Sequence, residues 1–430
     1  MNRYDEYVDS NIPWIKEIPS HWRVLRGKNV LSLLNRPAKD DDEIITCFRD
    51  GEVTLRKNRR EDGFTVSLQE IGYQGIEPGD LVVHGMDGFA GAIGISDSRG
   101  KSTPVLNVMD SSENKRYLMY YLRAAAIKDV FMSLSTGIRV RSCDLRWNKL
   151  SVFPFVVPKK KEQEEIAGFL DQKLAEIDSI INEAYASIEE YKAWKASIIY
   201  EAVTKGLDPS AKMKDSGVPW IGLIPAQWGT CSLKRLTTKI GSGKTPLGGA
   251  EVYTTEGILF LRSQNIFNTG LEVESAFYIS EEINSTMENS QVQYQDVLLN
   301  ITGGSIGRCC IYDLNGIRAN VNQHVCILRT IKTKLLPGYL RYFWISSAGP
   351  MVVEQYQTGG NRPGLNFEQI GATKIPYCDI ETQQQIVEYL DCKCEEIDTL
   401  VEEKTSLIQD LESYKKSLIF EVVTGKRRVC

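Results

Sequence analysis

The sequence predicts two mixed α/β (α+β) globular domains in tandem repeat, each followed by a long coiled-coil helix. Three observations support this fold class. A motif rich in proline and tryptophan occurs twice, two segments carry a sustained heptad pattern, and both intervening blocks contain short apolar strands that lead into glycine-rich turns. The predicted parts are a domain over residues 1–158, a helix over 159–206, a second domain over 207–380 and a second helix over 381–430.

The repeat is visible near both ends of each copy. The motif that begins at Asp9, Asp-Ser-Asn-Ile-Pro-Trp-Ile, returns at Asp215 as Asp-Ser-Gly-Val-Pro-Trp-Ile, an offset of 206 residues. The run Phe169-Leu-Asp-Gln-Lys returns at Tyr389 as Tyr-Leu-Asp-Cys-Lys, an offset of 220 residues that holds without a gap along the helical segments. The second globular block is therefore 14 residues longer than the first, and the helices match residue for residue.

Apolar residues recur at steps of four and three through both helical segments, with charged residues on their flanks. This pattern indicates a coiled-coil seam, and about 43 residues of helix would be roughly 65 Å long. Because so long a seam exceeds what one small block can cover, we expect the two helices to pack on each other. The predicted seam residues are Leu170, Leu174, Ile177, Ile181, Ile188, Leu390, Ile397, Val401, Ile408 and Leu411.

The two globular blocks share short secondary-structure signals. Apolar runs that follow Asp80 and Asp296 predict short strands entered from a turn, and each leads into a glycine-rich segment. Tyr117–Ile127 and Gly338–Ser346 predict short helices with one apolar face. The residues between these signals differ widely, so we expect one scaffold that carries two different surfaces.

The charge distribution separates the helices from the blocks. The net charge is −5, with 25% charged and 42% hydrophobic residues, as in ordinary globular protein. Residues 162–206 contain 10 acidic and 4 basic side chains, and residues 381–430 contain 11 and 7, whereas the two blocks are neutral to mildly basic. An acidic helix is unsuited to a phosphate backbone, so the blocks are the candidate nucleic-acid readers.

The sequence favours the cytoplasm over a membrane or a secreted location. The first residues lack the basic and apolar regions of a signal peptide. The longest uncharged stretch, Ser216–Leu233, contains two prolines and three glycines, which excludes it as a membrane span. The ten cysteines do not have the spacing of paired metal knuckles, so we expect reduced thiols and no metal site.

No constellation of catalytic residues is found in the sequence. The segment Gly241-Ser-Gly-Lys-Thr resembles the end of a phosphate-binding loop, but Thr238 stands where the full pattern needs a glycine. The chain has no Pro-Pro or Pro-Cys dipeptide of the kind that methyltransferase motifs need, and Asp40–Glu43 has the character of a solvated turn. Three histidines give no convincing triad.

The residues that remain suit recognition of DNA. Arginine, asparagine and glutamine have the donor geometry to read guanine and adenine edges, and lysine and arginine hold phosphates. The candidates in the first block are a basic cluster and the arginines around a loop: Arg56, Lys57, Arg59, Arg60, Arg139, Arg141 and Arg146. The candidates in the second block are Lys244, Arg262, Gln264, Asn265, Asn361 and Arg362.

The pattern as a whole resembles the specificity subunit of type I restriction-modification systems. The resemblance rests on the paired Asp-Ser-x-x-Pro-Trp-Ile-x-x-Ile-Pro-x-x-Trp motif, on Gly243-Lys-Thr-Pro, on Phe260–Ile266, and on the helix starts at Glu162 and Glu381. It covers essentially the whole chain. One departure is that Pro154 and Pro158 stand apart, where the family often has a proline pair before the first helix.

This resemblance implies two target-recognition domains separated by two long helices that pair antiparallel. It implies that the subunit is not an enzyme and that each domain reads one half of a bipartite, gapped site in double-stranded DNA, the N-terminal domain taking the 5′ half. The helix pair would set the gap and bind two DNA methyltransferase subunits, which restriction motor subunits join. S-adenosylmethionine, ATP and magnesium would belong to these partners, with no cofactor in this chain.

Other functions stay open on the sequence alone. A coiled-coil adaptor without a DNA role explains the helices but not the two diverged blocks. An antirestriction decoy or a phase-variable cassette is compatible with the same sequence, and an enzyme ranks third because a catalytic constellation is lacking. Because the two blocks differ in their candidate residues, we expect an asymmetric target site.

Overall fold

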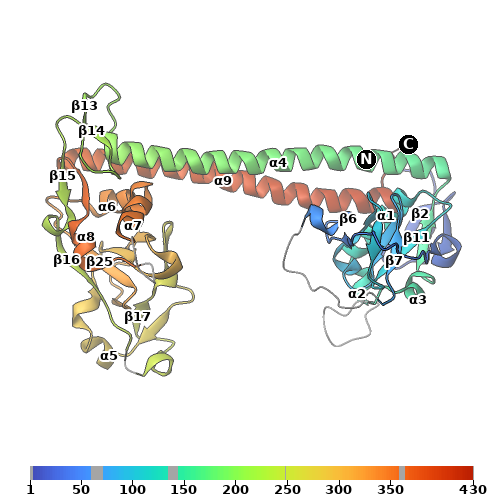
Figure 1. Cartoon of the computed structure of the whole chain (residues 1–430), viewed down its shortest axis with the longest axis horizontal. Helices are drawn as coiled ribbons and strands as arrows, with labels where there is room; N and C mark the ends of the chain where they lie inside the picture. The colour runs from blue at the N-terminus through green and yellow to red at the C-terminus, as the bar shows by residue number, and fades with distance from the viewer. Residues whose placement is uncertain (1–2, 60–70, 134–143, 247, 358–363, 430) are drawn as a thin grey trace. The chain divides into compact units, whose positions relative to one another are not determined.

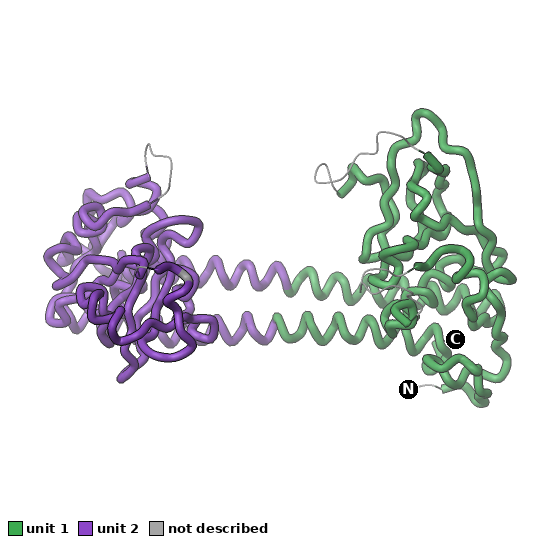
Figure 2. The backbone as a smooth tube through the Cα atoms, turned by 90° about the horizontal axis from the view of Figure 1, so that it is seen from below, with its two compact units in different colours: residues 1–184, 405–430 green, residues 185–404 purple. Residues whose placement is uncertain are grey.

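The computed structural model describes residues 3–59, 71–133, 144–246, 248–357 and 364–429. The chain divides into two units (Figures 1 and 2): unit 1 contains residues 1–184 and 405–430, and unit 2 contains residues 185–404. Each of the two long helices contributes one part to unit 1 and the other part to unit 2.

Unit 1 is built on a four-stranded antiparallel sheet with strand order β4-β11-β8-β9. Its central strands pair with Val108 opposite Val82, and both of these valines are fully buried. The sheet strands are β4 (Ser32–Leu33), β8 (Leu81–His84), β9 (Ile93–Ile95) and β11 (Leu106–Asp110). The paired short strands are β1 (Tyr7–Asp9) with β2 (Glu17–Pro19), β3 (Arg23–Arg26) with β12 (Pro154–Val157), β5 (Ile45–Cys47) with β6 (Val53–Leu55), and β7 (Gln74–Ile76) with β10 (Gly100–Ser102).

Unit 2 repeats this plan with the strand order β16-β25-β22-β23 and adds a second four-stranded sheet, β20-β17-β24-β21. The first sheet contains β16 (Thr237–Ser242), β22 (Val297–Asn300), β23 (Cys309–Ile311) and β25 (Val325–Thr330). The second contains β17 (Ile258–Leu261), β20 (Phe277–Ile279), β21 (Gln291–Val292) and β24 (Ala319–Val321). The short pairs are β13 (Met213–Asp215) with β14 (Leu223–Pro225), β15 (Gly229–Ser232) with β26 (Lys374–Tyr377), and β18 (Ile266–Phe267) with β19 (Gly270–Leu271).

The shorter helices agree with the sequence prediction. The predicted helices near Tyr117 and Gly338 are α1 (Lys115–Ile127) and α6 (Pro337–Ile345). Asn114 caps α1 by accepting hydrogen bonds from the backbone N–H groups of Arg116 and Tyr117. The other helices of the units are α2 (Val130–Ser133), α3 (Trp147–Leu150), α5 (Glu281–Ser285), α7 (Ala348–Tyr356) and α8 (Phe367–Ala372).

The two long helices are α4 (Lys160–Lys205) and α9 (Ile380–Val423). The prediction that the second helix continues to residue 430 is corrected, because α9 ends at Val423 and Gly425 adopts the left-handed conformation that terminates helices. Of the predicted seam residues, Val401 and Leu411 are partly buried and all the others are buried.

Ion pairs on the helices give their direction. In unit 1 the Lys415 ammonium pairs with Asp178, and in unit 2 Lys195 Nζ lies 2.6 Å from Asp398. From the first pair to the second, the residue number increases along α4 and decreases along α9, so the helices are antiparallel. The two pairs are also equivalent by the 220-residue offset, which confirms that the helices repeat residue for residue.

Equivalent tyrosines join each short helix to the long helices. In unit 1, Tyr117 Oη donates to the Val423 carbonyl oxygen at 3.2 Å and Tyr120 Oη donates to Asp171 at 2.7 Å. In unit 2, Tyr339 Oη donates to the Val203 carbonyl oxygen at 2.8 Å and Tyr342 Oη donates to Asp391 at 2.5 Å. Each domain is thus fixed to the end of one long helix and to the beginning of the other.

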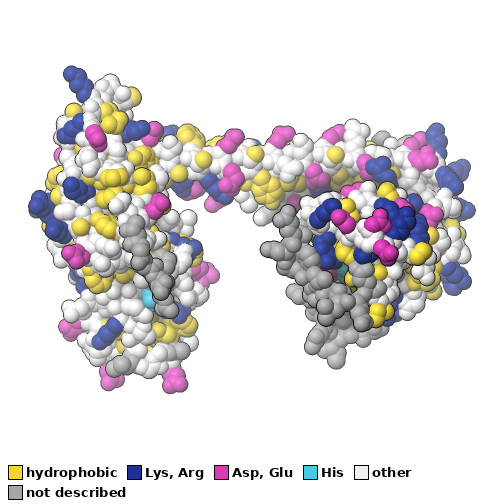
Figure 3. All heavy atoms as spheres, in the orientation of Figure 1, with side chains coloured by type: hydrophobic (Ala, Val, Ile, Leu, Met, Phe, Trp, Pro, Cys, Tyr) yellow, Lys and Arg dark blue, Asp and Glu magenta, His cyan; other side chains and the backbone are white. Residues whose placement is uncertain are grey.

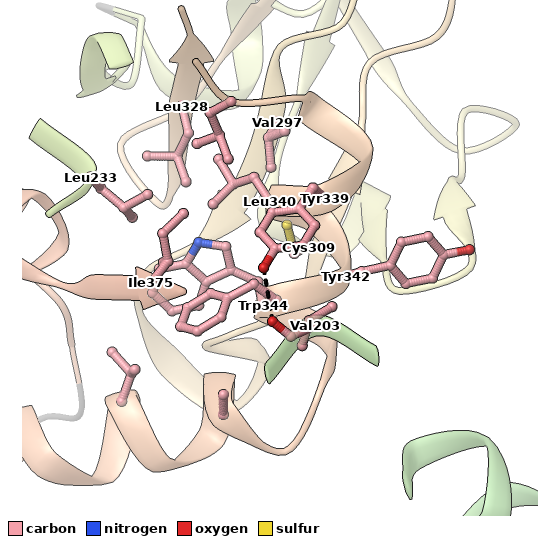
Figure 4. Packing of buried hydrophobic residues seen from close by; sticks show 14 of the residues in the cluster. Val203, Leu233, Val297, Cys309, Leu328, Tyr339, Leu340, Tyr342, Trp344 and Ile375 are labelled. Carbon is pink, nitrogen blue, oxygen red and sulfur yellow. Dashed lines mark hydrogen bonds between the residues drawn. The ribbon is translucent and has the colours of Figure 1, made fainter. Parts of the chain in front are cut away.

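The core of unit 2 shows how this attachment is packed (Figure 4). Val203, near the end of α4, lies against the aromatic side chains of α6, and the dashed line in the figure is its hydrogen bond with Tyr339. Trp344 is 1% exposed and lies with Leu340, Ile375 and other buried side chains in the same cluster. The end of α4 is therefore part of the hydrophobic core of unit 2.

A buried carboxylate in unit 1 joins the repeated N-terminal motif to α4. Glu162 Oε1 accepts from Tyr4 Oη at 2.7 Å and from Trp22 Nε1 at 3.0 Å, and its Oε2 lies 3.0 Å from His21 Nε2. We expect Glu162→Ala to lower the free energy of unfolding by about 2–3 kcal/mol, because it leaves the buried Trp22 indole N–H without its acceptor and removes a charged group that joins three side chains. Urea unfolding checks this, with Glu164→Ala as the matched control on the exposed side of the same turn; equal losses from both variants would contradict it.

Candidate DNA interface and partner surface

Several loops of unit 2 meet at one end of its two sheets. Leu261 pairs with Val321 where β17 and β24 end, and the Asn322 backbone N–H donates to the Leu261 carbonyl oxygen at 3.1 Å. The Gly243 backbone N–H donates to the Asn322 carbonyl oxygen at 3.1 Å, which brings in the loop after β16. We call this region the loop edge of unit 2; it comprises residues 243–246, 262–265, 301–305 and 322–324.

Four side chains from three of these loops form one hydrogen-bonded chain. Thr245 Oγ1 lies 2.7 Å from Gln323 Oε1, and Gln323 Nε2 lies 3.1 Å from His324 Nε2. His324 Nδ1 lies 2.6 Å from Thr302 Oγ1. Gln323 is exposed, and His324 and Thr302 are half-buried, so the chain runs from the surface into the loop edge.

The predicted residues of the second block lie in different environments. Lys244 and Gln264 are exposed at the loop edge. The Arg262 guanidinium lies 4.1 Å from the centroid of the Phe277 ring, and its buried Nε has no hydrogen-bond partner among the described residues. Asn361 and Arg362 lie outside the described residues.

Asn265 is turned away from solvent. It is fully buried, its Oδ1 accepts from the Arg262 backbone N–H at 3.0 Å, and its Nδ2 donates to the Glu272 carbonyl oxygen at 2.9 Å. These bonds hold the turn after β17. Its structural role is therefore to fix the position of Arg262 and Gln264, and the amide itself is not presented at the surface.

The predicted basic cluster of the first block is paired within unit 1. Lys57 Nζ lies 2.6 Å from Glu43, and Arg59 Nη1 lies 2.6 Å from Asp50 and 2.8 Å from Glu52. The hydrogen bond to Asp50 raises the pKa of Arg59, whose charge is compensated locally. Arg56 Nε donates to Thr46 Oγ1 at 3.2 Å, Arg146 Nε lies 3.1 Å from Asp144, and Arg60, Arg139 and Arg141 lie outside the described residues.

All four residues of the hydrogen-bonded chain at the loop edge were missed by the sequence reasoning. Thr245, Thr302, Gln323 and His324 were not among the predicted residues. The signal that could have indicated them is the polar run Asn-Gln-His at 322–324, which lies between two apolar strands. Polar residues directly before a buried strand are well placed to reach the edge of a sheet.

The long helices present apolar side chains to solvent beside their seam (Figure 3). In unit 1, Ile180 and Tyr414 are each 45% exposed; in unit 2, Trp194 is 50% and Leu400 is 36% exposed. Each of these residues directly precedes a seam position of its helix, so all four occupy the same flank of the heptad pattern. We call Ile180 with Tyr414 flank patch 1, and Leu400 with Trp194 flank patch 2; the two patches are equivalent by the 220-residue offset.

Comparisons with known proteins show which proteins this chain is similar to. The model of the type I restriction modification DNA specificity domain matches residues 225–409. A putative type I restriction enzyme MjaX specificity subunit from Methanocaldococcus jannaschii is 22% identical, with 96% of each chain covered. The EcoBI specificity subunit of Escherichia coli is 23% identical, covering 98% of this chain and 89% of the relative.

The chain is similar to type I restriction specificity subunits over nearly its full length. The matches to these two relatives span nearly the full length of the chain, so they include both copies of the repeat and both long helices. They fit the interpretation as a DNA-recognition subunit and do not fit the alternative of a coiled-coil adaptor or decoy.

Solved structures confirm the fold of this chain. A chain from a structure on complex assembly and conformational transition of the type I R-M system superimposes with a TM-score of 0.72 at 12% identity, covering 94% of this chain and 98% of that chain. The HsdS subunit from Thermoanaerobacter tengcongensis gives a TM-score of 0.56 at 13% identity, covering 95% and 98%. In the part of the chain that the structure describes, no helix is long and apolar enough to span a membrane.

Proposed function

We propose that this chain is the sequence-specific DNA-recognition subunit of a type I restriction-modification complex, in which each globular domain reads one half of an asymmetric, gapped site. The observation that carries the proposal is the duplication itself. One sheet topology and one set of helix attachments occur twice, whereas the loops that they present differ between the copies. The match of the DNA specificity domain to residues 225–409 supports DNA as the ligand of these loops.

We further propose that the paired helices set the gap between the half-sites and bind two methyltransferase subunits. The two flank patches support this, because exposed apolar side chains beside a coiled-coil seam are suited to packing against further helices. Their equivalence within the repeat supports two copies of the same partner, since a duplicated surface can bind one partner twice. Restriction motor subunits would join through the methyltransferase subunits.

The chemistry of modification and cleavage is assigned to these partners. We propose that S-adenosylmethionine, ATP and magnesium bind to the methyltransferase and motor subunits, and that this chain contributes binding and position. The proposal agrees with the naming of its relatives as specificity subunits. It places the complex in the cytoplasm, where the host DNA is.

DNA binding by the isolated chain is expected to be weak and dependent on salt. Non-specific affinity comes mainly from cations that neutralise phosphates, and Lys57, Arg59 and Arg329 each pair with a carboxylate of their own domain. We expect a Kd of about 10⁻⁴–10⁻⁶ M at physiological salt for the chain alone, and much tighter binding by the complex with methyltransferase. Fluorescence anisotropy over a salt series measures both; tight, specific binding by the isolated chain would contradict the proposal.

A further inference from the structure

The hydrogen-bonded chain at the loop edge of unit 2 has a defined direction. The Gln323 amide nitrogen carries hydrogens and no lone pair for bonding, so it donates to His324 Nε2. The ring proton of the neutral imidazole is then on Nδ1, which donates to Thr302 Oγ1. At the other end, the Thr245 hydroxyl donates to Gln323 Oε1. Together these bonds hold the Gln323 amide between Thr245 and His324.

The same bonds leave part of the Gln323 amide available. A primary amide has two N–H donors and two lone pairs on its oxygen. Among the described residues, Thr245 takes one lone pair and His324 takes one hydrogen. One donor and one acceptor remain on this exposed group. In the major groove, adenine presents N6–H as donor and N7 as acceptor, which a glutamine amide binds with two hydrogen bonds.

Neighbouring residues at the loop edge support a DNA ligand here. Lys244 is exposed next to Thr245 and has no ion-pair partner among the described residues, so it is available for a phosphate. The backbone bonds between Gly243, Asn322 and Leu261 tie these loops to the ends of two sheets. An amide on a loop that is tied to the ends of strands loses little rotamer freedom on binding, which favours discrimination between bases.

We propose that Gln323 reads one adenine in the half-site recognised by unit 2, and that Thr245 and His324 are positioning residues that fix its amide. The inference rests on the proposed function and adds the base and the side chain that reads it. A glutamine whose two ends are free to exchange could accept other bases as well. The two positioning residues leave the amide with one free donor and one free acceptor, the pair that adenine requires.

The test uses the complex of the full chain with its cognate methyltransferase. The target site is first mapped by single-molecule sequencing of methylated bases. Binding is then measured to duplexes that carry this site, with each adenine of the second half replaced in turn by 7-deazaadenine, which lacks the N7 acceptor. For the unaltered complex we expect one position to weaken binding by about 5- to 100-fold, the range for a base contact of this type.

Variants connect that position to Gln323. We expect Gln323→Ala to weaken binding to the natural duplex by a similar factor. The variant complex should bind the natural duplex and the duplex with 7-deazaadenine at that position equally well. Thr245→Val should reduce the discrimination between adenine and 7-deazaadenine at that position, and Thr245→Ser should retain it. The matched control is Gln293→Ala, an exposed glutamine in the turn at the opposite end of β22, which should leave the response unchanged. Unaltered reading of the first half-site in each variant shows that the complex is folded.

Three results would overturn the inference. The second half-site could lack an adenine that responds to 7-deazaadenine, or Gln323→Ala could leave every position read as before. Gln323→Ala could also lose affinity while it keeps the full response to 7-deazaadenine, which would show a supporting role only. Failure of the proposed function gives a different result from these three, because the unaltered complex would then methylate no gapped site at all. That result would also overturn the inference about Gln323.

Discussion

Replacing one flank patch with aspartate is expected to remove one of the two methyltransferase subunits from the complex. The variants are Ile180→Asp with Tyr414→Asp for flank patch 1, and Trp194→Asp with Leu400→Asp for flank patch 2. Large apolar anchors typically contribute about 2 kcal/mol or more at an interface, and a charge placed there also has to be desolvated. Native mass spectrometry should therefore show one methyltransferase per chain for either variant and none for the two combined.

A matched control separates this effect from general damage to the helices. Glu189 and Gln409 are exposed and equivalent within the repeat, and each directly follows a seam residue, so they lie on the flank away from the patches. The variant Glu189→Ala with Gln409→Ala should keep two methyltransferase subunits. Circular dichroism should report unchanged helix content for all variants. Retention of both partners when both patches carry aspartates would contradict the proposed docking surface.

The second large effect is expected at Gly243, where the loop edge of unit 2 is most tightly packed. A Cβ at this position would overlap the backbone carbonyl oxygen of Val321, which cannot move without separating β24 from its neighbours. We expect Gly243→Ala to cost about 3 kcal/mol or more of stability, because the overlap is with backbone. Reading of the second half-site should be lost, while unit 1 should still read the first.

Gly241 gives the control for this prediction. It lies two residues earlier on β16, and a Cβ there would meet no heavy atom within 4 Å. Gly241→Ala should therefore change stability by no more than about 0.5 kcal/mol. Urea unfolding and the methylation pattern measure the two consequences separately. If the two alanine variants had the same stability and the same methylation pattern, the close packing around Gly243 would not be required for folding or for reading the second half-site.

The features that could be predicted from the sequence are those set by local spacing. The seam from Leu170 to Ile188 was predicted because steps of four and three place side chains on one helix face whatever the rest of the chain does. The same holds for α1 and α6, whose apolar faces are contained in one short segment. The motif repeat at Asp9 and Asp215 predicted that the two units share a plan, which their common strand order confirms.

The candidate interface could be predicted only in part, because it depends on contacts between distant segments. The pairing of Leu261 with Val321 brings Thr245, Thr302 and Gln323 together, and no local pattern contains this pairing. Asn265 was included because asparagine can read adenine, but its amide bonds to its own turn instead. Lys57 and Arg59 were included as cations, and the carboxylates that pair with them come from strands and turns outside the cluster.

The central claim is that each globular domain reads one half of the target site, and an exchange of one domain tests it most directly. Residues 207–380 are replaced by the corresponding domain of another specificity subunit, the chain is co-expressed with its methyltransferase, and methylated bases are mapped by single-molecule sequencing. We expect a gapped, two-part site in which only the half assigned to the exchanged domain changes, while the other half and the gap stay as in the intact chain. A site altered in both halves, or a stable complex that methylates no gapped site, would contradict the claim.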